Sequence, residues 1–408
     1  MPAIKPDRVL GDLYKLRSFG TYKTGVHRPT FSPEDIASRK WFAEQCTAAD
    51  LDTTIDGIGN ILGKSKASGA KALSGSHLES QNHAGWLDGA LGCVYALEAS
   101  RAIKEAGGDT GVDVVVFADE EGHFGSFLGS KSFTGLLTDA DIDKAKDKTS
   151  GTPMREALQA AGYAGRPRLM IEPERYDSFF EAHIEQGASL EGEEKRIGVV
   201  TAIVAIWQYG ITVIGEQNHA GTTSMTRRRD AGLALIKLLN AIDKRFPEIC
   251  GPRTVWTTGR IALDPGSHSI IPGRAEALFQ LRDADPAVLD KLHAELNDLV
   301  AAANRVSRCQ FELTVISQST PALMDERLMA ALDTAAERHA KGKHVRMPSG
   351  AGHDAQYMAQ LCPAGMIFVP SVGGISHAPK EYTKPQDCVN GANVLLQTIL
   401  NLDAAGWT

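Results

Sequence analysis

The sequence predicts an α/β fold with a mixed, mainly parallel sheet that is interrupted by an inserted ferredoxin-like α+β domain. An apolar run at residues 112–118 follows a helical pattern at residues 90–103, and such a run is typical of a strand buried on both faces of a parallel sheet. Between residues 209 and 316 the pattern changes to strand, helix, two strands, helix and strand. That order is the ferredoxin-like arrangement.

The composition is that of a soluble globular protein. A chain of 408 residues exceeds the usual size of one hydrophobic core, so two domains are expected. The formal net charge of -7 argues against nucleic acid or an anionic membrane surface as a partner, because both require clustered cations. The sequence has no apolar run long enough to span a membrane, and its start lacks the apolar core of a signal peptide, so we expect a cytoplasmic protein.

The N-terminal part predicts helices followed by strands. Residues 7–48 predict a helix, a loop and a second helix, which Ser32 caps ahead of Pro33. Residues 51–63 alternate in the manner of strands and contain turn signals. The next segment leads to His77, which we place at a junction between a strand and a helix.

The remaining elements divide the chain into two domains. The α/β pattern continues with a strand at 179–184, a helix at 325–339, a strand at 364–369 and a helix at 386–400. The first and last thirds of the chain therefore build one domain, which we assign to residues 1–208 and 320–408. Residues 209–319 form the inserted domain.

Histidine and carboxylate side chains stand at the ends of predicted strands or in Gly-rich loops. These are His77, Asp88, the pair Glu120-Glu121, His183 and His377. In open α/β sheets, ligands bind in the crevice beyond the carboxyl ends of the strands, so residues far apart in sequence can converge there. Taken singly, each histidine is more often a structural or surface group than a metal ligand.

Together, these residues suit a metal centre. Three imidazoles and two carboxylates favour Zn²⁺, and Mn²⁺, Co²⁺ and Ni²⁺ are also compatible with them. Five ligands are too many for one catalytic zinc ion and suit two metals that share a carboxylate, an arrangement used in hydrolysis.

Adjacent carboxylates at a strand end can take two different roles. One of Glu120 and Glu121 can bind metal while the other faces a metal-bound water and acts as general base. The alternative is that the pair forms a solvated acidic turn.

Seven segments of the chain carry a family resemblance. In chain order they are GSHLESQNHAGWLDGALG, FADEEGHFGSFLGS, EAHIEQG, NHAGTTSMTRRRDA, IIPGRAEALFQLRD, SGAGHDAQ and GGISHAPKE. They resemble the dinuclear-metal amidohydrolases of the aminoacylase/carboxypeptidase-like M20 metallopeptidases, and most of all the N-carbamoyl-L-amino-acid hydrolase, β-ureidopropionase and allantoate amidohydrolase group. The resemblance covers essentially the whole chain. It implies a phosphorylase/hydrolase-like catalytic domain and an inserted domain that serves as lid and dimerisation domain.

The resemblance also implies a role for each candidate residue. His77 and His183 would hold one metal, Glu121 and His377 the other, and Asp88 would bridge the two. Glu120 would be the general base. For the substrate, the resemblance implies contacts from Gln186, from His219 of a partner subunit, which polarises the scissile carbonyl, and from Arg282, whose planar guanidinium suits a carboxylate.

The chain departs from the pattern of this group at Glu79, at Ser269 and in the loop after Glu121, which lacks the Arg commonly found before Phe124. The group usually has Asp where this chain has Glu79, and that carboxylate would orient the imidazole of the metal ligand two residues earlier. The group also usually has Asn where this chain has Ser269, so Ser269 is an uncertain substrate contact. We expect a shifted geometry at Glu79 and an altered substrate preference.

The sequence thus predicts a homodimeric hydrolase of linear C–N amide bonds. Its substrate would be an N-carbamoyl-L-amino acid or a related N-substituted amino acid with a free carboxylate, attacked by metal-bound hydroxide. The alternatives are an N-acyl amino acid, allantoate or a dipeptide on the same site. A non-catalytic binding protein is a further alternative, and the survival of all five ligand types together with Glu120 argues against it.

Overall fold

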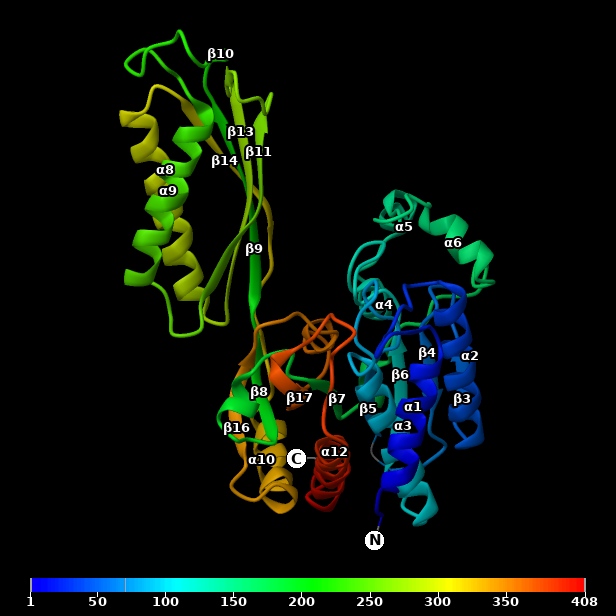
Figure 1. The fold of residues 1–408 in the computed structure, drawn as a ribbon. Coiled ribbons are helices and arrows are strands. Elements are labelled where there is room, and N and C mark those ends of the chain that lie inside the picture. Colours follow the sequence, from blue (N-terminus) through cyan, green and yellow to red (C-terminus); the bar gives the residue numbers. More distant parts are fainter. Residues whose placement is uncertain (1, 70, 407–408) are drawn as a thin grey trace. The chain divides into compact units, whose positions relative to one another are not determined.

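The structure is a computed structural model that describes residues 2–69 and 71–406. The chain forms two compact units (Figure 1). One comprises Met1–Ala202 and Leu323–Thr408, and the other comprises Ile203–Ala322.

The first unit is built on a mixed sheet with the strand order β15-β8-β17-β7-β5-β6-β4-β3, and β16 also pairs with β8. The strands are β3 (Asp52–Ile55), β4 (Ile61–Lys64), β5 (Lys71–His77), β6 (Gly111–Phe117), β7 (Ser178–Ile184), β8 (Ile197–Ile203), β15 (Ala322–Leu323), β16 (His344–Ser349) and β17 (Ala364–Val369). The central neighbours β17, β7, β5 and β6 run parallel, whereas β4 pairs antiparallel with β3 and β6, and β8 pairs antiparallel with β17. The sheet is therefore parallel at its centre and antiparallel toward its edges, and the prediction of a mixed, mainly parallel sheet is confirmed.

The described part of this unit contains ten α-helices. They are α1 (Pro6–Ser18), α2 (Pro33–Ala48), α3 (Ala90–Glu105), α4 (Leu128–Phe133), α5 (Asp139–Lys144), α6 (Met154–Ala160), α7 (Ser189–Gly192), α10 (Glu326–His339), α11 (Ala355–Met358) and α12 (Pro385–Ala404). Helix α3 packs on β5, β6 and β7 and is itself contacted by α1 and α12. Ser32 caps α2 by accepting the amide hydrogen of Asp35, in the way that the sequence predicts.

The parallel register brings three strand ends to one edge of the sheet. His77, the last residue of β5, pairs with Phe117, the last residue of β6. Strand β7 runs parallel to β5 and carries His183 next to its final residue. Side chains at these carboxyl ends can therefore meet at a common site.

The second unit contains a four-stranded antiparallel sheet in the order β11-β13-β9-β14. Its elements in chain order are β9 (Ala205–Ile214), β10 (Asn218–His219), α8 (Ala231–Arg245), β11 (Val255–Asp264), β12 (Ile270–Ile271), β13 (Arg274–Asp283), α9 (Pro286–Val306) and β14 (Gln310–Gln318). Helices α8 and α9 lie side by side against one face of the sheet (Figure 1). Their apolar residues, including Leu235 and Leu292, form a core with inward-facing residues of β13 such as Phe279.

Several elements differ from the expectations drawn from sequence. Strand β9 begins at Ala205, whereas the sequence predicts its start near Tyr209. Strand β16 and the short helices α4, α5 and α6 were not predicted, because each is too short to show a clear period. Strand β8 was not predicted either, although its apolar run is as long as that of β6. None of the helices formed by the described residues combines the length and the apolar character that a membrane span requires.

Candidate metal centre

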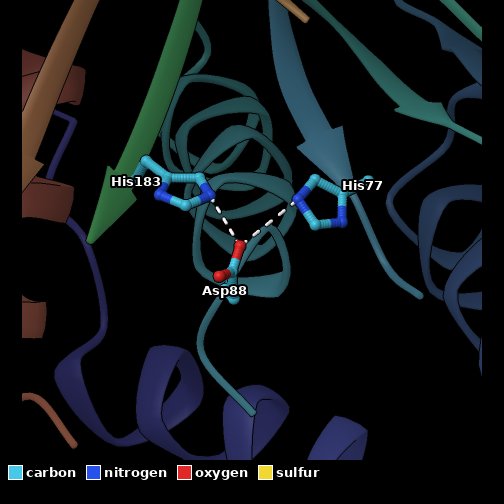
Figure 2. Close-up of side chains that lie close together, drawn as sticks. All are labelled: His77, Asp88 and His183. Atoms are coloured by element: carbon cyan, nitrogen blue, oxygen red, sulfur yellow. Dashed lines mark ion pairs between the residues drawn. The ribbon is translucent and has the colours of Figure 1, made fainter. Parts of the chain in front are cut away.

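Two groups of metal-ligand side chains meet in the α/β unit. One contains His77, Asp88 and His183, and the other contains Asp88, Glu121 and His377. Within each group, one potential ligand atom per residue lies within 4.8 Å of the others. Figure 2 shows the imidazoles of His77 and His183 pointing toward Asp88 from either side.

Asp88 stands between the two groups. Its Oδ1 lies 2.9 Å from His183 Nε2 and 3.4 Å from His77 Nε2. Its Oδ2 lies 3.3 Å from Nε2 of His377, which is 3.5 Å from Glu121 Oε2. The two oxygens of one carboxylate thus serve different groups, and the structure brings together all five residues that the resemblance implies as metal ligands.

Backbone carbonyls orient two of the imidazoles. His77 Nδ1 donates to the carbonyl oxygen of Glu79 at 3.1 Å, and His183 Nδ1 donates to the carbonyl oxygen of Ile184 at 2.8 Å. Their Nε2 atoms are therefore directed at the Asp88 carboxylate, and the Gly89 amide nitrogen lies 3.2 Å from His183 Nε2. This pattern, in which the far nitrogen of a ligating histidine is held by a carbonyl, is common at metal sites.

The donor set fits a cation. His77 Nε2 is buried and has no hydrogen-bond partner within the described part of the chain, although Asp88 Oδ1 lies 3.4 Å away and Glu120 Oε2 lies 3.6 Å away. An orphaned lone pair facing two buried carboxylates is unfavourable unless a positive charge lies between them. A divalent metal ion satisfies this requirement.

The close approach of buried carboxylates and imidazoles shifts the pKa values of the residues in this site. Burial raises the pKa of Glu120 well above its ordinary value, and burial together with Asp88 raises the pKa of Glu121. Burial opposes the ionisation of Asp88 as well, but His183 and the other imidazoles hold the pKa of Asp88 well below its ordinary range. The hydrogen bond with Asp88 raises the pKa of His377 to about 9.

These pKa shifts predict how the stability of the metal-free protein depends on pH. Despite burial, neighbouring carboxylates also raise the pKa of His77 and His183 above the ordinary value. Protonated imidazoles therefore stabilise the metal-free fold fully below the unfolded-state pKa of about 6.5, and this stabilisation is lost as the pH rises toward about 9. We expect the urea midpoint of the chelated protein to fall between pH 7 and 9.

The metal-loaded protein provides the control for this prediction. Metal binding requires neutral imidazoles, so the loaded protein does not depend on these protons and its midpoint should fall less over the same interval. Parallel urea titrations of the chelated and reloaded protein at several pH values would measure the difference. Identical pH profiles for the two forms would contradict this account.

Further polar side chains contact the backbone and the carboxylate of Asp88, and the sequence did not predict these contacts. Glu381 is buried and accepts the amide hydrogens of Leu87 at 3.0 Å and Asp88 at 3.1 Å. The hydroxyl of Ser376 lies 3.1 Å from Asp88 Oδ2 and 3.0 Å from Glu381 Oε2. A Cβ at Gly85 would lie about 2 Å from the Glu381 carboxyl group, so only glycine allows this approach. The one available signal was the position of Glu381 in the same SHAPKE segment as His377.

The structure differs from the expectation for Glu79. Its carboxylate Oε1 lies 3.9 Å from His77 Nδ1, which is too far for a hydrogen bond. The backbone carbonyl of Glu79 accepts from that nitrogen instead. The carboxylate is directed to Arg39 and to the amide of Glu120. The extra methylene of Glu, relative to Asp, carries the carboxylate past the imidazole.

The residues proposed to contact substrate lie in different places. Gln186 belongs to the metal centre, because its Nε2 lies 2.8 Å from Asp88 Oδ2 and 3.3 Å from His377 Nε2. His219 and Ser269 lie together in the second unit, where the amide of Ala220 donates to the carbonyl oxygen of Ser269 at 2.9 Å.

The loop after His219 folds back onto its own imidazole. Nδ1 of His219 accepts the amide hydrogens of Gly221 at 3.0 Å and Thr222 at 3.2 Å. These two amides are therefore engaged by the ring and do not face an anion. The bonds fix the neutral tautomer of the ring, in which Nε2–H is an exposed donor.

Arg282 lies at the opposite end of the second unit's sheet. It is the second-to-last residue of β13, and the strand register places it opposite Ile206 of β9 and Val255 of β11. It alternates with the inward-facing Leu281 and Asp283, so its side chain belongs to the face of the sheet away from α8 and α9.

Comparison with known proteins defines the class to which this fold and donor set belong. An α/β unit with histidines and carboxylates gathered at the carboxyl ends of parallel strands is typical of metal-dependent hydrolases. Residues 71–401 match the peptidase family M20/M25/M40, and the chain belongs to this family.

Relatives and solved structures match over nearly the whole chain. An allantoate amidohydrolase of Escherichia coli is 34% identical, with 95% of each chain covered. An N-carbamoyl-L-amino-acid amidohydrolase of Paenarthrobacter aurescens is 31% identical over 97% of this chain and 98% of its own. The crystal structure of an amidase of the hydantoinase/carbamoylase family from Burkholderia phymatum is 43% identical, with a TM-score of 0.93, and covers 100% of this chain and 99% of its own.

Proposed function

We propose that this protein hydrolyses a linear carbamoyl or ureido C–N bond in an N-carbamoyl-L-amino acid or a related N-substituted amino acid, with two divalent cations. The observation that carries the proposal is the sharing of Asp88 between two groups of ligand atoms, with Glu120 beside one of them. The activities named for the relatives from Escherichia coli and Paenarthrobacter aurescens support this class of substrate.

The proposed ligand sets follow the two groups. His77 and His183 hold one cation, Glu121 and His377 hold the other, and Asp88 contributes one oxygen to each. Zn²⁺, Mn²⁺, Co²⁺ and Ni²⁺ all suit these nitrogen and oxygen donors. When bound, such a pair of cations polarises the substrate carbonyl and lowers the pKa of water.

Glu120 is the proposed general base. Its carboxylate Oε2 lies 3.6 Å from His77 Nε2, at the border of the first group of ligands. Burial raises its pKa well above the ordinary value, so this carboxyl holds a proton more readily than an exposed glutamate does, as a group that accepts and then returns a proton requires. Glu120 takes a proton from the attacking water and passes it to the nitrogen that leaves when the C–N bond breaks.

Two residues of the second unit are the proposed substrate contacts. The Arg282 guanidinium binds the substrate carboxylate in a bidentate manner, and Nε2–H of His219 donates to the carbonyl that is attacked. Ser269, which lies next to His219, is a further proposed substrate contact. Its short hydroxyl side chain leaves more room for the substrate than a larger side chain would.

His219 and Arg282 of one chain are too far apart to share a substrate. Strand β13 has 10 residues and spans about 30 Å at about 3.3 Å per residue. Arg282 lies at one end of it, and β12, which pairs with the strand of His219, immediately precedes its other end at Arg274. The proposed site is therefore completed by His219 of a second copy, which makes the protein a homodimer in which the second unit acts as lid and dimerisation domain.

Subunit complementation tests the shared site. We expect chains with Glu120→Gln and chains with His219→Ala to be inactive separately. Mixed dimers should recover activity, because one of their two sites combines an intact Glu120 with an intact His219 from the other chain. Turnover of the two variants before and after co-refolding would measure this. Absence of recovery in proven mixed dimers would show that His219 serves its own chain.

A substrate panel tests the reaction itself. N-carbamoyl, N-formyl and N-acetyl L-amino acids, allantoate and dipeptides would be offered to protein loaded with Zn²⁺, Mn²⁺ or Co²⁺. The proposal predicts turnover of the N-carbamoyl or ureido compounds with release of the amino acid. Preference for N-acyl amino acids or dipeptides would favour the alternative reactions of the same site, and absence of turnover with every compound would contradict the proposal.

The role of Arg282 is tested with the same panel. Arg282→Lys should raise KM for free carboxylate substrates more than for their C-terminal amides, because lysine cannot reproduce the bidentate contact. Equal effects on both kinds of substrate would remove Arg282 as the carboxylate ligand.

A further inference from the structure

A row of buried charges lies behind the metal centre and is not used by the proposed reaction. Asp35, Arg39 and Glu79 are each 0% exposed. The Arg39 Nε donates to both carboxylate oxygens of Asp35 at 3.0 Å, and its Nη2 donates to Glu79 Oε2. Although burial alone would raise the pKa of Glu79, the Arg39 guanidinium holds that pKa below its ordinary value.

The other oxygen of Glu79 reaches the catalytic segment. Glu79 Oε1 accepts the amide hydrogen of Glu120 at 2.6 Å. Arg39 also donates from Nη1 and Nη2 to the carbonyl oxygen of Phe117, each at 3.2 Å. One guanidinium therefore holds the segment 117–120 at both ends, directly at Phe117 and through Glu79 at Glu120.

The backbone of this segment needs such support. Asp119 precedes Glu120 and has a φ of 58°, in the left-handed region that a non-glycine residue rarely adopts. Such conformations persist only where surrounding contacts determine them. Asp119 accepts amide hydrogens from Phe124 and Gly125, which fixes the turn on its far side and leaves the Glu120 amide to Glu79.

We propose that Arg39 and Glu79 are positioning residues for Glu120, holding its backbone so that its carboxylate faces the attacking water. This inference rests on the proposed role of Glu120 as base. In this proposal the Glu79 carboxylate does not act by orienting His77. The imidazole of His77 is held by the backbone carbonyl of Glu79, and the Glu79 carboxylate lies out of hydrogen-bond range of it.

The chemistry of the side chain defines the test. Glu79→Gln keeps the length, but it replaces one of the two acceptor oxygens by an NH2 group, so either Arg39 or the Glu120 amide faces a donor and loses its acceptor. Glu79→Asp keeps the charge, but it is one methylene too short to span the two donors. Both variants should lower kcat by about 10–100-fold with little change in KM, as is usual when an outer contact of a metal site is lost.

Two measurements that need no turnover make the test specific. Metal content and metal affinity, determined by competition with a chelator, should remain at the wild-type level, because the bond that orients His77 is intact. Hydrogen–deuterium exchange of the peptide covering residues 117–124 should accelerate, while exchange of β5 stays unchanged. These two results remain informative even if the substrate assignment fails.

Asp113→Asn is a matched control. Asp113 is a buried carboxylate on β6, the strand that leads into residues 117–120. It forms an ion pair with Arg175 at 2.7 Å and lies near the start of β6, away from that segment. Its replacement should lower thermal stability without changing kcat or the exchange of residues 117–124. Where Glu79→Gln does not fold, Arg39→Lys serves as the second variant, because a lysine cannot contact Asp35, Phe117 and Glu79 together.

Two outcomes would overturn the proposal. Wild-type kcat and wild-type exchange at residues 117–124 in folded Glu79→Gln would show that the carboxylate positions nothing. Loss of metal with unchanged exchange in this segment would show that it acts through His77.

Discussion

Replacing Glu120 by Gln is expected to lower kcat by about 10²–10⁴-fold, which is the usual contribution of a general base. The amide cannot accept the proton of the attacking water, whereas its size and its backbone contact with Glu79 are preserved. The metal content should not change, because Glu120 belongs to neither group of ligand atoms. Steady-state turnover combined with metal analysis of the same sample would measure both effects.

The neighbouring glutamate provides the contrast. Glu121→Gln should lose metal affinity as well as activity, since Glu121 Oε2 lies beside His377 Nε2. If Glu120→Gln retained activity, or if the two variants lost metal equally, the division of roles within the pair would be wrong.

Replacing Asp88 by Asn is expected to have an effect of similar or larger size, because it removes the only carboxylate that contacts both groups of ligands within the described residues. An amide has one acceptor oxygen and no charge, so it cannot serve two cations. We expect a loss of turnover of roughly 10³-fold or more, because Lewis-acid stabilisation contributes several kcal/mol and about 1.4 kcal/mol corresponds to a tenfold change in rate. Metal analysis should show fewer than two ions per chain.

A second buried aspartate controls for the loss of a buried charge. Asp56 is fully buried and accepts the amide hydrogens of Ile58 and Asn60 in the turn between β3 and β4. Asp56→Asn should reduce stability and leave the metal content unchanged. Full metal occupancy in Asp88→Asn would contradict the bridging role.

Long elements with a clear period were predictable from the sequence, and short ones were not. The buried run of β6 and the regular apolar spacing of α3 lie close to their predicted bounds. Strand β16, which includes Pro348, and the short helix α11 depend on their neighbours in the fold more than on any periodic pattern. Sequence patterns also could not give the strand order, in which β7 pairs with β5 and β17 pairs with the other edge of β7.

The candidate ligands were predictable because their chemistry is local, and the contacts behind them were not. His77 and His183 end apolar strands, and Asp88 lies in a Gly-flanked loop. Arg39, in contrast, appears in the sequence as one more charged residue of a predicted helix. Only the folded chain shows that it turns inward, which is why the direction taken by the Glu79 carboxylate could not be foreseen.

Stepwise metal reconstitution tests the central claim most directly. The chelated protein would be titrated with Zn²⁺, Mn²⁺ or Co²⁺, and bound metal and hydrolysis of an N-carbamoyl-L-amino acid would be measured on the same samples. The account predicts no turnover without metal and a rise in activity that ends at two ions per chain. A chain that binds no divalent metal under non-chelating conditions, or one that hydrolyses the substrate equally well after chelation, would contradict it.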